Sequence, residues 1–479
     1  MYLPGAEEWS GGSLSVNGAD VFCSSSGKVS RKWLSGCKRE RALTQDLMAK
    51  IASPLNLAAA LRQVVKNGGS PGHDGMTTDS LMRWFRSHLN ELSSSLLSGQ
   101  YQPSAVREVN IPKPKGGYRT LGIPTVKDRL VQQAISQVMS KRYERIFSNQ
   151  SYGFRPGRSA HEALKSAGKH IGEGRRWIVD IDLEKYFDTV NHDRLMWLLN
   201  TRIGDQSLLK LISRFLRAGM FREGIVSQRI SGTPQGSPLS PLLSNIVLDE
   251  LDKELESRGH RFVRYADDLI IMTGSEQSAH RVMASVTRFL EHRMKLKVNR
   301  EKSHIRRPHE VNFLGHTFHH DGGLGLSVES ERRFKLALKL VTRRSRGISL
   351  NQMVRELNAN LRGWLQYFRF ARMRGKLRKM ESWLNRRIRC FRLKQCKRAI
   401  GIARFLRKLG VPGNRCWTVA GSSKGWHRLA ASHSAHEGMN INWLREIGLI
   451  SLTIFYCSIF KETAQYERRT LGGVRGRQS

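Results

Sequence analysis

The residues best suited to chemistry are two adjacent aspartates, Asp267 and Asp268, in the stretch Phe-Val-Arg-Tyr-Ala-Asp-Asp-Leu-Ile-Ile-Met at 262–272. Short apolar, β-branched runs on either side predict a hairpin with the acidic pair at its tip. Adjacent carboxylates repel one another, and removing them from water without a partner costs several kcal/mol. A divalent cation supplies such a partner, and Mg²⁺ is the hard ion that oxygen ligands suit. The alternative is an ordinary solvated Asp-Asp turn.

A third carboxylate strengthens the metal hypothesis. Residues 176–190 predict a buried strand that runs into a helix. Asp180 and Asp182 fall on the same face of that strand because side chains alternate with a period of two. Asp182 beside the acidic pair would give three carboxylates for two Mg²⁺ ions roughly 4 Å apart, the arrangement that clamps the attacking and leaving oxygens in phosphoryl transfer.

Three motifs resemble, in order and spacing, those of the group II intron reverse transcriptases/maturases. They are Asp182-x-x-x-x-Phe187-Asp188, then Pro-Gln-Gly-Ser-Pro-Leu-Ser-Pro-Leu at 234–242, then Tyr-Ala-Asp-Asp at 265–268. The resemblance covers about 43–460. It implies an α+β right-hand polymerase, with fingers and an antiparallel palm sheet, followed by a helical thumb/maturase region. The implied protein is an RNA-directed DNA polymerase that also binds its intron RNA, assists splicing and supports intron mobility.

Composition sets limits on partners and location. The formal net charge of +41 predicts a polyanionic partner, either nucleic acid or an anionic membrane surface. The most apolar run, 447–460, is too short to span a bilayer and predicts a core helix, and the N-terminus has no signal-peptide pattern. With no export signal we expect a cytoplasmic protein, and the family resemblance implies a bacterial protein associated with nucleic acid.

The cysteines predict free, reduced thiols. They lie at 23, 37, 390, 396, 416 and 457, and none forms a Cys-x-x-Cys pair. A zinc ribbon or HNH-type zinc site is therefore not supported. We accordingly expect no appended endonuclease domain of the kind that some relatives carry.

The elements that must position the acidic residues follow one another in five segments. Residues 43–97 have helical periodicity, broken by Gly- and Pro-containing turns at 67–75. The predicted segments are a disordered leader at 1–42, an N-terminal extension at 43–105, reverse transcriptase fingers and palm at 106–325, a helical thumb/maturase region at 326–410, and the end of the maturase region with a small DNA-binding segment at 411–479.

Candidate nucleotide contacts lie in the predicted fingers. Residues 106–124 predict a hairpin, and Lys113, Lys115 and Arg119 would project from its tip. A solvated basic hairpin explains them equally well. The resemblance instead implies that Lys113 or Lys115, with Arg119, binds the triphosphate of an incoming dNTP, since Arg bonds phosphate bidentately and Lys acts as a point charge.

Two further nucleotide contacts follow from the resemblance. Phe187 would lie against the sugar 2′ position and disfavour a ribose hydroxyl, although a buried core Phe is the alternative. Gln235 would pack on the nucleotide and hydrogen-bond it. Asp188 falls outside the predicted site by periodicity and is expected to be structural.

Candidate nucleic-acid contacts are spread more widely. Arg155 lies in the turn-rich loop 151–159, which the resemblance places along the template–nucleotide path, with a plain loop as the alternative. Gly315 falls in a strand similar to the family's primer-gripping strand, where Gly permits close backbone approach.

Residues 331–410 hold the densest positive charge. They contain 25 Lys plus Arg against 3 Asp plus Glu, a net of +22. A solvated face would mix both signs, whereas here one sign dominates with aromatic residues between, which favours contact with a folded RNA. The stretch containing Arg386, Arg387 and Arg389 resembles the family's thumb/maturase region.

Two rival functions remain compatible with parts of this pattern. A splicing-only RNA-binding maturase would be marked by loss of one of the three Asp, and all three are present. A retron or diversity-generating reverse transcriptase would lack the basic helical region, and a viral RNA-dependent RNA polymerase would favour Gly before the Asp pair. The expected partners are intron RNA, a DNA target and primer, and dNTPs, with two Mg²⁺ as cofactor. The sequence predicts no oligomeric state.

Overall fold

The computed structural model describes residues 46–112, 116–222, 225–227, 232 and 236–460. Helices combine with mainly antiparallel sheets, so the α+β prediction is confirmed. Contacts divide the chain into two compact units, one comprising Met1–Phe147 with Lys185–Glu250 and the other Ser148–Glu184 with Leu251–Ser479. The predicted leader at 1–42 lies outside the described residues.

The first unit begins with helices, as the periodicity of 43–97 predicts. Ser53 caps α3 by accepting a hydrogen bond from the Asn56 N–H, and Pro54 occupies its first position, where a missing N–H costs nothing. The helices of this unit are α2 (Leu47–Ala52), α3 (Pro54–Asn67), α4 (Thr78–Leu97), α5 (Val126–Tyr143), α7 (Tyr186–Thr189), α8 (His192–Arg202), α9 (Gln206–Arg217) and α10 (Ser240–Ser257), whose sequence contains the unit boundary.

A four-stranded sheet in the first unit contains the predicted hairpin. Its order is β2-β1-β4-β5, and β1 pairs with β2 antiparallel from Arg107 opposite Ile123 to Pro112 opposite Tyr118. The tip of this hairpin, with Lys113 and Lys115, lies outside the described residues. The strands are β1 (Val106–Pro112), β2 (Tyr118–Ile123), β4 (Met220–Arg222) and β5 (Ile225–Ser227).

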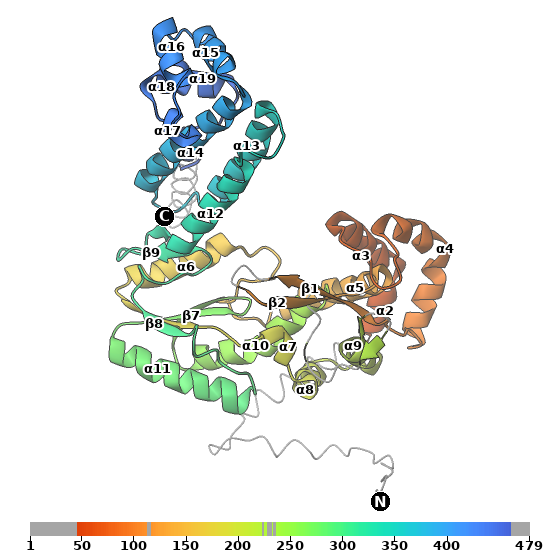
Figure 1. Ribbon diagram of the computed structural model, residues 1–479. Coiled ribbons are helices and arrows are strands. Elements are labelled where there is room, and N and C mark those ends of the chain that lie inside the picture. The colour runs from red at the N-terminus through yellow and green to blue at the C-terminus, as the bar shows by residue number, and fades with distance from the viewer. Residues whose placement is uncertain (1–45, 113–115, 223–224, 228–231, 233–235, 461–479) are drawn as a thin grey trace, which may run out of the picture. The chain divides into compact units, whose positions relative to one another are not determined.

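The second unit contains the palm sheet, with strand order β6-β7-β3-β8 and antiparallel pairing throughout. This confirms the predicted antiparallel palm. In Figure 1, helix α6 lies on one side of this sheet and helix α11 on the other. The elements are α6 (Ala160–Gly172), β3 (Trp177–Ile181), β6 (Arg261–Tyr265), β7 (Asp268–Thr273), α11 (Glu276–Arg288), a π-helical turn η2 (Phe289–Arg293) and β8 (His304–Arg306).

The apolar residues of the palm sheet alternate as its strands require. Val263 and Ile270 pack with Leu164 and Ile171 of α6 in one buried core. Helix α6 starts where the sequence signals it, because Ser159 and Glu162 form a capping box that satisfies the first N–H groups. The sheet is thereby fixed against a helix whose first residue follows the turn-rich 151–159 loop.

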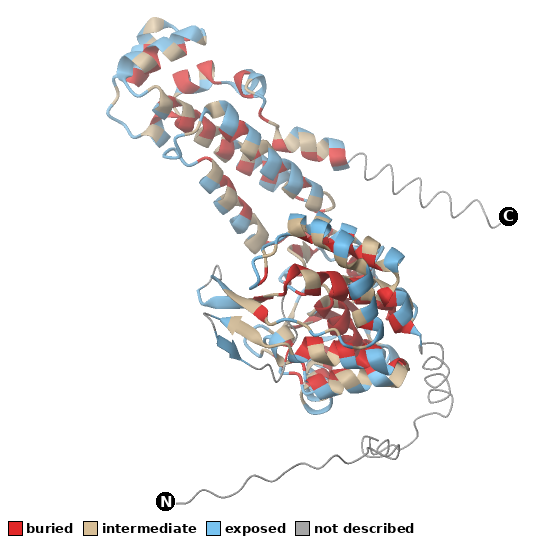
Figure 2. Cartoon of the chain, turned by 90° about the vertical axis from the view of Figure 1, so that its right-hand side faces the viewer, coloured by how far each residue is buried: buried red, intermediate tan, exposed pale blue. Residues whose placement is uncertain are grey.

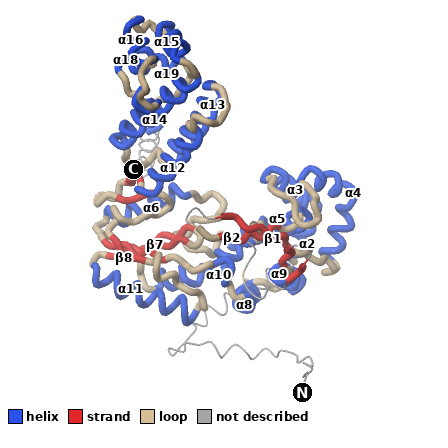
Figure 3. The backbone as a smooth tube through the Cα atoms, in the orientation of Figure 1, coloured by secondary structure: helices blue, strands red, loops and turns tan. Residues whose placement is uncertain are grey.

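A helical region completes the second unit. Among the described residues no strand follows β10, as Figure 3 shows. Buried and exposed positions alternate around its helices in Figure 2, as amphipathic helices require. The elements after the palm sheet are β9 (His316–Phe318), β10 (Leu324–Leu326), α12 (Val328–Val341), α13 (Leu350–Tyr367), α14 (Arg374–Gln395), α15 (Ala399–Lys408), α16 (Gly413–Ala420), α17 (Trp426–Leu429), α18 (His433–Gly438) and α19 (Ile441–Glu446).

One hydrophobic core joins the helical region from Leu326 to Ile459. The apolar run at 447–460 contributes Leu449, Leu452, Tyr456 and Ile459 to it, so the prediction of a core segment is confirmed. In the part of the chain that the structure describes, no helix is long and apolar enough to cross a membrane.

Candidate active site

The acidic pair lies at the turn between β6 and β7. The predicted hairpin is present, and Tyr265 pairs with Asp268 across it. Its two-residue turn is Ala266 and Asp267, so only Asp267 lies at the tip and Asp268 begins β7. Ala266 has a positive φ of 59°, a conformation that normally calls for Gly at the first central position of such a turn. The backbone that carries Asp267 and Asp268 is therefore locally unfavourable and depends on its surroundings.

Strand β3 brings Asp182 to the same place. The antiparallel register pairs Ile181 with Leu269, so Asp182 leaves β3 level with Asp268. The Asp182 N–H donates to Ser303 Oγ at 3.0 Å, and its C=O accepts from the Asn299 N–H at 2.8 Å. The structure therefore gathers Asp182, Asp267 and Asp268 at one end of two adjacent strands.

These carboxylates repel one another. Desolvation and the charges of Asp267 and Asp182 raise the pKa of Asp268 from 3.8 to about 6. The Asp268 side chain is still open to solvent, so repulsion by its negatively charged neighbours is the main physical cause of this rise. Asp180, one alternation earlier on β3, is desolvated and faces Asp268, and its pKa rises from 3.8 to about 7 despite Arg306 nearby.

A lysine that the motifs do not include lies at this cluster. Lys302 Nζ is 3.3 Å from Asp182 Oδ2 and offsets part of the local negative charge. Lys302 and Ser303 lie in the turn before β8, more than a hundred residues from Asp182 along the chain. A lysine in a turn gives no signal in the sequence, and only the spatial pairing identifies it.

The cluster fits a cation by charge and donor type. Carboxylate oxygens suit Mg²⁺, and the mutual repulsion that raises the pKa of Asp268 would be relieved by a bound cation. Within the described ranges, no three His, Cys, Asp or Glu side chains are already grouped closely enough to hold a metal ion. The three carboxylates thus provide suitable oxygen ligands, but their side chains are not arranged as a complete metal site.

The loop 151–159 supports the acidic turn. The Tyr152 N–H donates to the Arg264 C=O, and the Arg264 N–H donates to the Gln150 C=O, both at 2.9 Å. A Cβ at Gly153 would lie 2.2 Å from the Ala266 nitrogen, so only glycine fits beside the turn. Gly153 therefore belongs to the site through its contact with Ala266. Its place in the 151–159 loop did not reveal that contact.

Arg155 has a different role from the one predicted. Its side chain is 6% exposed, and its guanidinium donates to the carbonyls of Ser148 and Ser151. The arginine stabilises the loop from inside, so the structure corrects our assignment of Arg155 to nucleic-acid contact.

The predicted nucleotide contacts are described only in part. Lys113, Lys115 and Gln235 lie outside the described residues. Arg119 is exposed on β2. Phe187 lies in α7 and is half-buried, whereas its neighbour Tyr186 is buried and donates its hydroxyl to the Ser244 C=O. The aromatic residue of this motif that packs in the core is thus Tyr186. Sugar selection by Phe187 stays a prediction.

Gly315 lies close to Ser330 and Phe368 of the same chain. It has a φ of 80°, and a Cβ there would lie 2.7 Å from Ser330 Oγ and 3.2 Å from Phe368 Cζ. The close approach that glycine permits is therefore made by helices α12 and α13. These contacts explain the glycine without a ligand, and close contact of Gly315 with nucleic acid stays a prediction.

The arginine cluster in α14 is largely structural. Arg389 is 5% exposed and donates to the Met439 C=O at 2.7 Å, while Arg387 donates to Thr342 Oγ1 at 2.6 Å. Because Arg389 is buried, the structure corrects our assignment of that residue to RNA contact. Arg386 and Arg387 are half-buried, so their contact with RNA stays a prediction.

The aromatic residues between these charges belong to the core. Trp364 stacks on Phe334 with ring centroids 4.0 Å apart, and Phe368 is buried. Tyr367 and Trp383 are partly buried against the same core. Packing within the core therefore explains these aromatic residues without a bound RNA, while Arg355 and Arg362 are exposed on α13.

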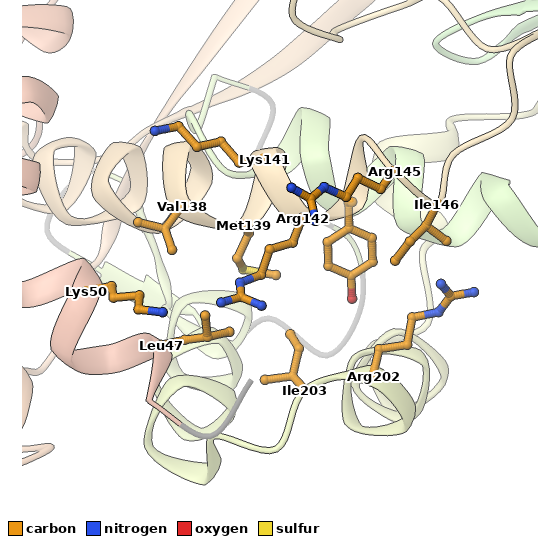
Figure 4. A pocket seen from close by; sticks show the side chains of 11 residues that line it. Leu47, Lys50, Val138, Met139, Lys141, Arg142, Arg145, Ile146, Arg202 and Ile203 are labelled. Atoms are coloured by element: carbon orange, nitrogen blue, oxygen red, sulfur yellow. The ribbon is translucent and has the colours of Figure 1, made fainter. Parts of the chain in front are cut away.

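A separate basic cavity of about 560 Å³ lies in the first unit (Figure 4). Four of its cations occupy the last turns of helices, where positive charge offsets the helix dipole: Lys50 in α2, Lys141 and Arg142 in α5, and Arg202 in α8. Its floor is apolar, with Met139 and Ile203 among its residues. The position of these cations has a structural explanation that requires no ligand.

Two family models match the chain. "Reverse transcriptase (RNA-dependent DNA polymerase)" matches residues 111–318, and "Group II intron, maturase-specific domain" matches residues 331–410. The first match contains the acidic turn and Asp182. The second covers most of the three long helices α12, α13 and α14.

Curated proteins and solved structures are similar to parts of this chain. Protein YkfC of Escherichia coli (strain K12) is 35% identical over 316 residues, which cover 57% of this chain and 82% of that protein. The group II intron-encoded protein LtrA of Lactococcus lactis subsp. cremoris is 35% identical over 232 residues, 48% of this chain and 38% of that protein. A chain of the solved "Partial Cas6-RT-Cas1--Cas2 complex" is 27% identical, with a TM-score of 0.34 over 52% of this chain and 43% of that one.

Proposed function

Because the chain belongs to the family of group II intron reverse transcriptases/maturases, we propose that it is an RNA-directed DNA polymerase that also binds intron RNA. The chain spans 82% of YkfC but only 38% of LtrA, so the activity of the whole protein is part of this proposal. The observation that carries it is the convergence of Asp182, Asp267 and Asp268 at one end of β3 and β7.

The proposed reaction is template-directed attack of a primer 3′-hydroxyl on the α-phosphate of a dNTP, with pyrophosphate leaving. Asp182, Asp267 and Asp268 would hold two Mg²⁺ ions, which supply activation of the hydroxyl and stabilisation of the leaving group. Carboxylates that repel one another favour cation binding, as the raised pKa of Asp268 indicates. The ammonium group of Lys302 pairs with Asp182, so a bound cation would compete with it for that carboxylate.

The nucleotide would be selected by residues of the first unit. Arg119 and the nearby lysines 113 and 115 would bind the triphosphate, Gln235 would contact the nucleotide, and Phe187 would exclude a ribose 2′-hydroxyl. Arg119 is exposed and Phe187 is only half-buried, so both side chains have surface available for a ligand.

The proposed RNA partner is the group II intron that would encode the protein. Exposed cations of the helical region, including Arg355 and Arg362, would contact its phosphates, which makes binding strongly dependent on salt. Splicing assistance would require this binding alone, and mobility would add a DNA target whose cleaved end primes synthesis.

Primer extension on an artificial RNA template tests the polymerase proposal. We expect Mg²⁺-dependent cDNA synthesis by the wild-type protein and its loss in Asp267→Asn, because one carboxylate of the cluster is then neutral. The matched control is Asp193→Asn, which changes an exposed aspartate of α8 outside the cluster and the motifs. Extension by Asp267→Asn within a few-fold of wild type would remove the acidic turn from the mechanism.

A further inference from the structure

The carboxylates of the acidic turn are held by a backbone whose own conformation is unfavourable. Ala266 has a φ of 59°, and the peptide that joins it to Asp267 sets the direction in which the Asp267 side chain leaves the turn. A metal site loses affinity when its ligands are not held in place. Some part of the fold must therefore fix the Ala266–Asp267 peptide.

A buried arginine makes that contact. Arg264 is 0% exposed, and its Nη1 donates to the Ala266 C=O at 2.9 Å. This carbonyl belongs to the same planar peptide as the Asp267 N–H, so the bond restricts its rotation. The guanidinium thus contacts the turn directly, two residues beyond its own position on β6.

The arginine is itself fixed by an aspartate. Asp252 of α10 is also 0% exposed, and it accepts from both Nε and Nη2 of Arg264, with Nε 2.7 Å from Oδ1. Two parallel bonds of this kind fix the plane of a guanidinium as well as its position. Val263 packs toward α6, so alternation directs Arg264 to the opposite face of the sheet, where α10 supplies Asp252.

Energetics favour a positioning role over a general stabilising one. A fully buried ion pair gives little net stability, since desolvation of both charges offsets their attraction, and apolar residues of similar volume often serve as well. What apolar residues cannot supply is the hydrogen bond to Ala266. Gly153 lies against the preceding Tyr265–Ala266 peptide, so both peptides that flank Ala266 have a close neighbour.

We propose that Arg264, held by Asp252, is a positioning residue that fixes the Ala266–Asp267 peptide and thereby the cation-binding geometry of the acidic turn. The inference rests on the proposed function, because it assigns the turn to a metal site. It adds residues that act without touching substrate or metal, and Asp252 precedes Arg264 by twelve positions in the chain.

Titration of the full-length protein with Mn²⁺, followed by electron paramagnetic resonance, tests this without relying on activity. In Arg264→Lys, the ammonium cannot make the bidentate contact and the turn contact together, so we expect the Mn²⁺ dissociation constant to rise at least about tenfold. The kcat for primer extension should fall with it, while KM for dNTP stays nearly unchanged. Arg129→Lys is the matched control, because Arg129 is 8% exposed and donates to the carbonyls of Gly68 and Ser70.

A double variant separates positioning from folding. Arg264→Met with Asp252→Leu removes both buried charges together, so we expect a folded protein by circular dichroism that still binds Mn²⁺ as weakly as Arg264→Lys. Wild-type Mn²⁺ affinity in either folded variant would overturn the proposal. So would failure of both to fold while Arg129→Lys folds, because the pair would then serve the whole unit.

The two proposals fail in different ways. If Asp267→Asn loses Mn²⁺ binding and the Arg264 variants do not, only the positioning role is overturned. If the Arg264 variants weaken Mn²⁺ binding but the wild-type protein extends no primer, the positioning role stands and the polymerase proposal fails. If Asp267→Asn binds Mn²⁺ as tightly as wild type, both are overturned.

Discussion

Replacing Asp180 by Asn should stabilise the metal-free protein at high pH. Burial and the charge of Asp268 raise the pKa of Asp180 from 3.8 to about 7, so the folded state disfavours its ionised form. That shift is roughly three pKa units at about 1.4 kcal/mol each, which sets an upper limit of about 4 kcal/mol. Relaxation of the neighbouring carboxylates makes the actual gain smaller. We expect the free energy of unfolding of Asp180→Asn to exceed that of wild type by roughly 1–3 kcal/mol and its Tm to rise by several degrees.

The stability difference between Asp180→Asn and wild type should depend on pH. Below about pH 4 the carboxyl is protonated in both states, so Asp180→Asn and wild type should have similar stability. Between about 4 and 7 the unfolded carboxyl ionises first, so wild type loses stability as pH rises and the variant gains relative to it. Above about 7 the difference should stay constant.

Thermal unfolding in EDTA, followed by circular dichroism at several pH values, measures this difference. Asp321→Asn provides a control of opposite sign, because a backbone N–H and Arg372 lower the pKa of Asp321 to about 2. That variant should be slightly less stable than wild type at neutral pH. A difference between Asp180→Asn and wild type that does not change with pH would refute the electrostatic reasoning.

Three further predictions concern the turn, the nucleotide and the RNA. Gly153→Ala should lower Mg²⁺-dependent primer extension by about tenfold or more, because its Cβ would lie 2.2 Å from the Ala266 nitrogen; Gly274→Ala, which meets open space, should not. Phe187→Ala should raise kcat/KM for rNTP relative to dNTP, and an unchanged ratio in a folded variant would leave Phe187 without a role in sugar selection. Arg355→Glu with Arg362→Glu should weaken RNA binding and reduce the slope of log K against log salt by roughly 0.7 to 0.9 per lost phosphate contact; an unchanged slope would exclude this face of α13.

The sequence predicted what depends on local pattern. The hairpin that carries Asp267 and Asp268 follows from two apolar runs around a short turn, and the strand before Asp182 follows from a continuous apolar segment. The register of β3 against β7, which the local pattern does not specify, then brings Asp182 level with Asp268. Local chemistry also predicted the capped start of α6 at Ser159.

The roles of individual cations could not be predicted in the same way. A charge count cannot distinguish an exposed guanidinium from one that donates to buried carbonyls, as Arg155 and Arg389 do. Glycine has the same limit, because the contacts of Gly315 with Ser330 and Phe368 become visible only in the folded chain. Lys302 and Asp252 approach their partners only in the folded chain, so no spacing in the sequence reveals them.

The central claim is that metal-dependent polymerisation belongs to the acidic turn, whereas RNA binding belongs to exposed cations of the helical region. A crossed experiment tests it most directly: primer extension and protein-assisted splicing are both measured on Asp267→Asn and on Arg355→Glu with Arg362→Glu, at near-physiological salt. We predict that Asp267→Asn loses extension and keeps splicing, and that the charge reversal weakens splicing more than extension. Loss of splicing in Asp267→Asn as severe as its loss of extension, with intron binding intact, would contradict the claim.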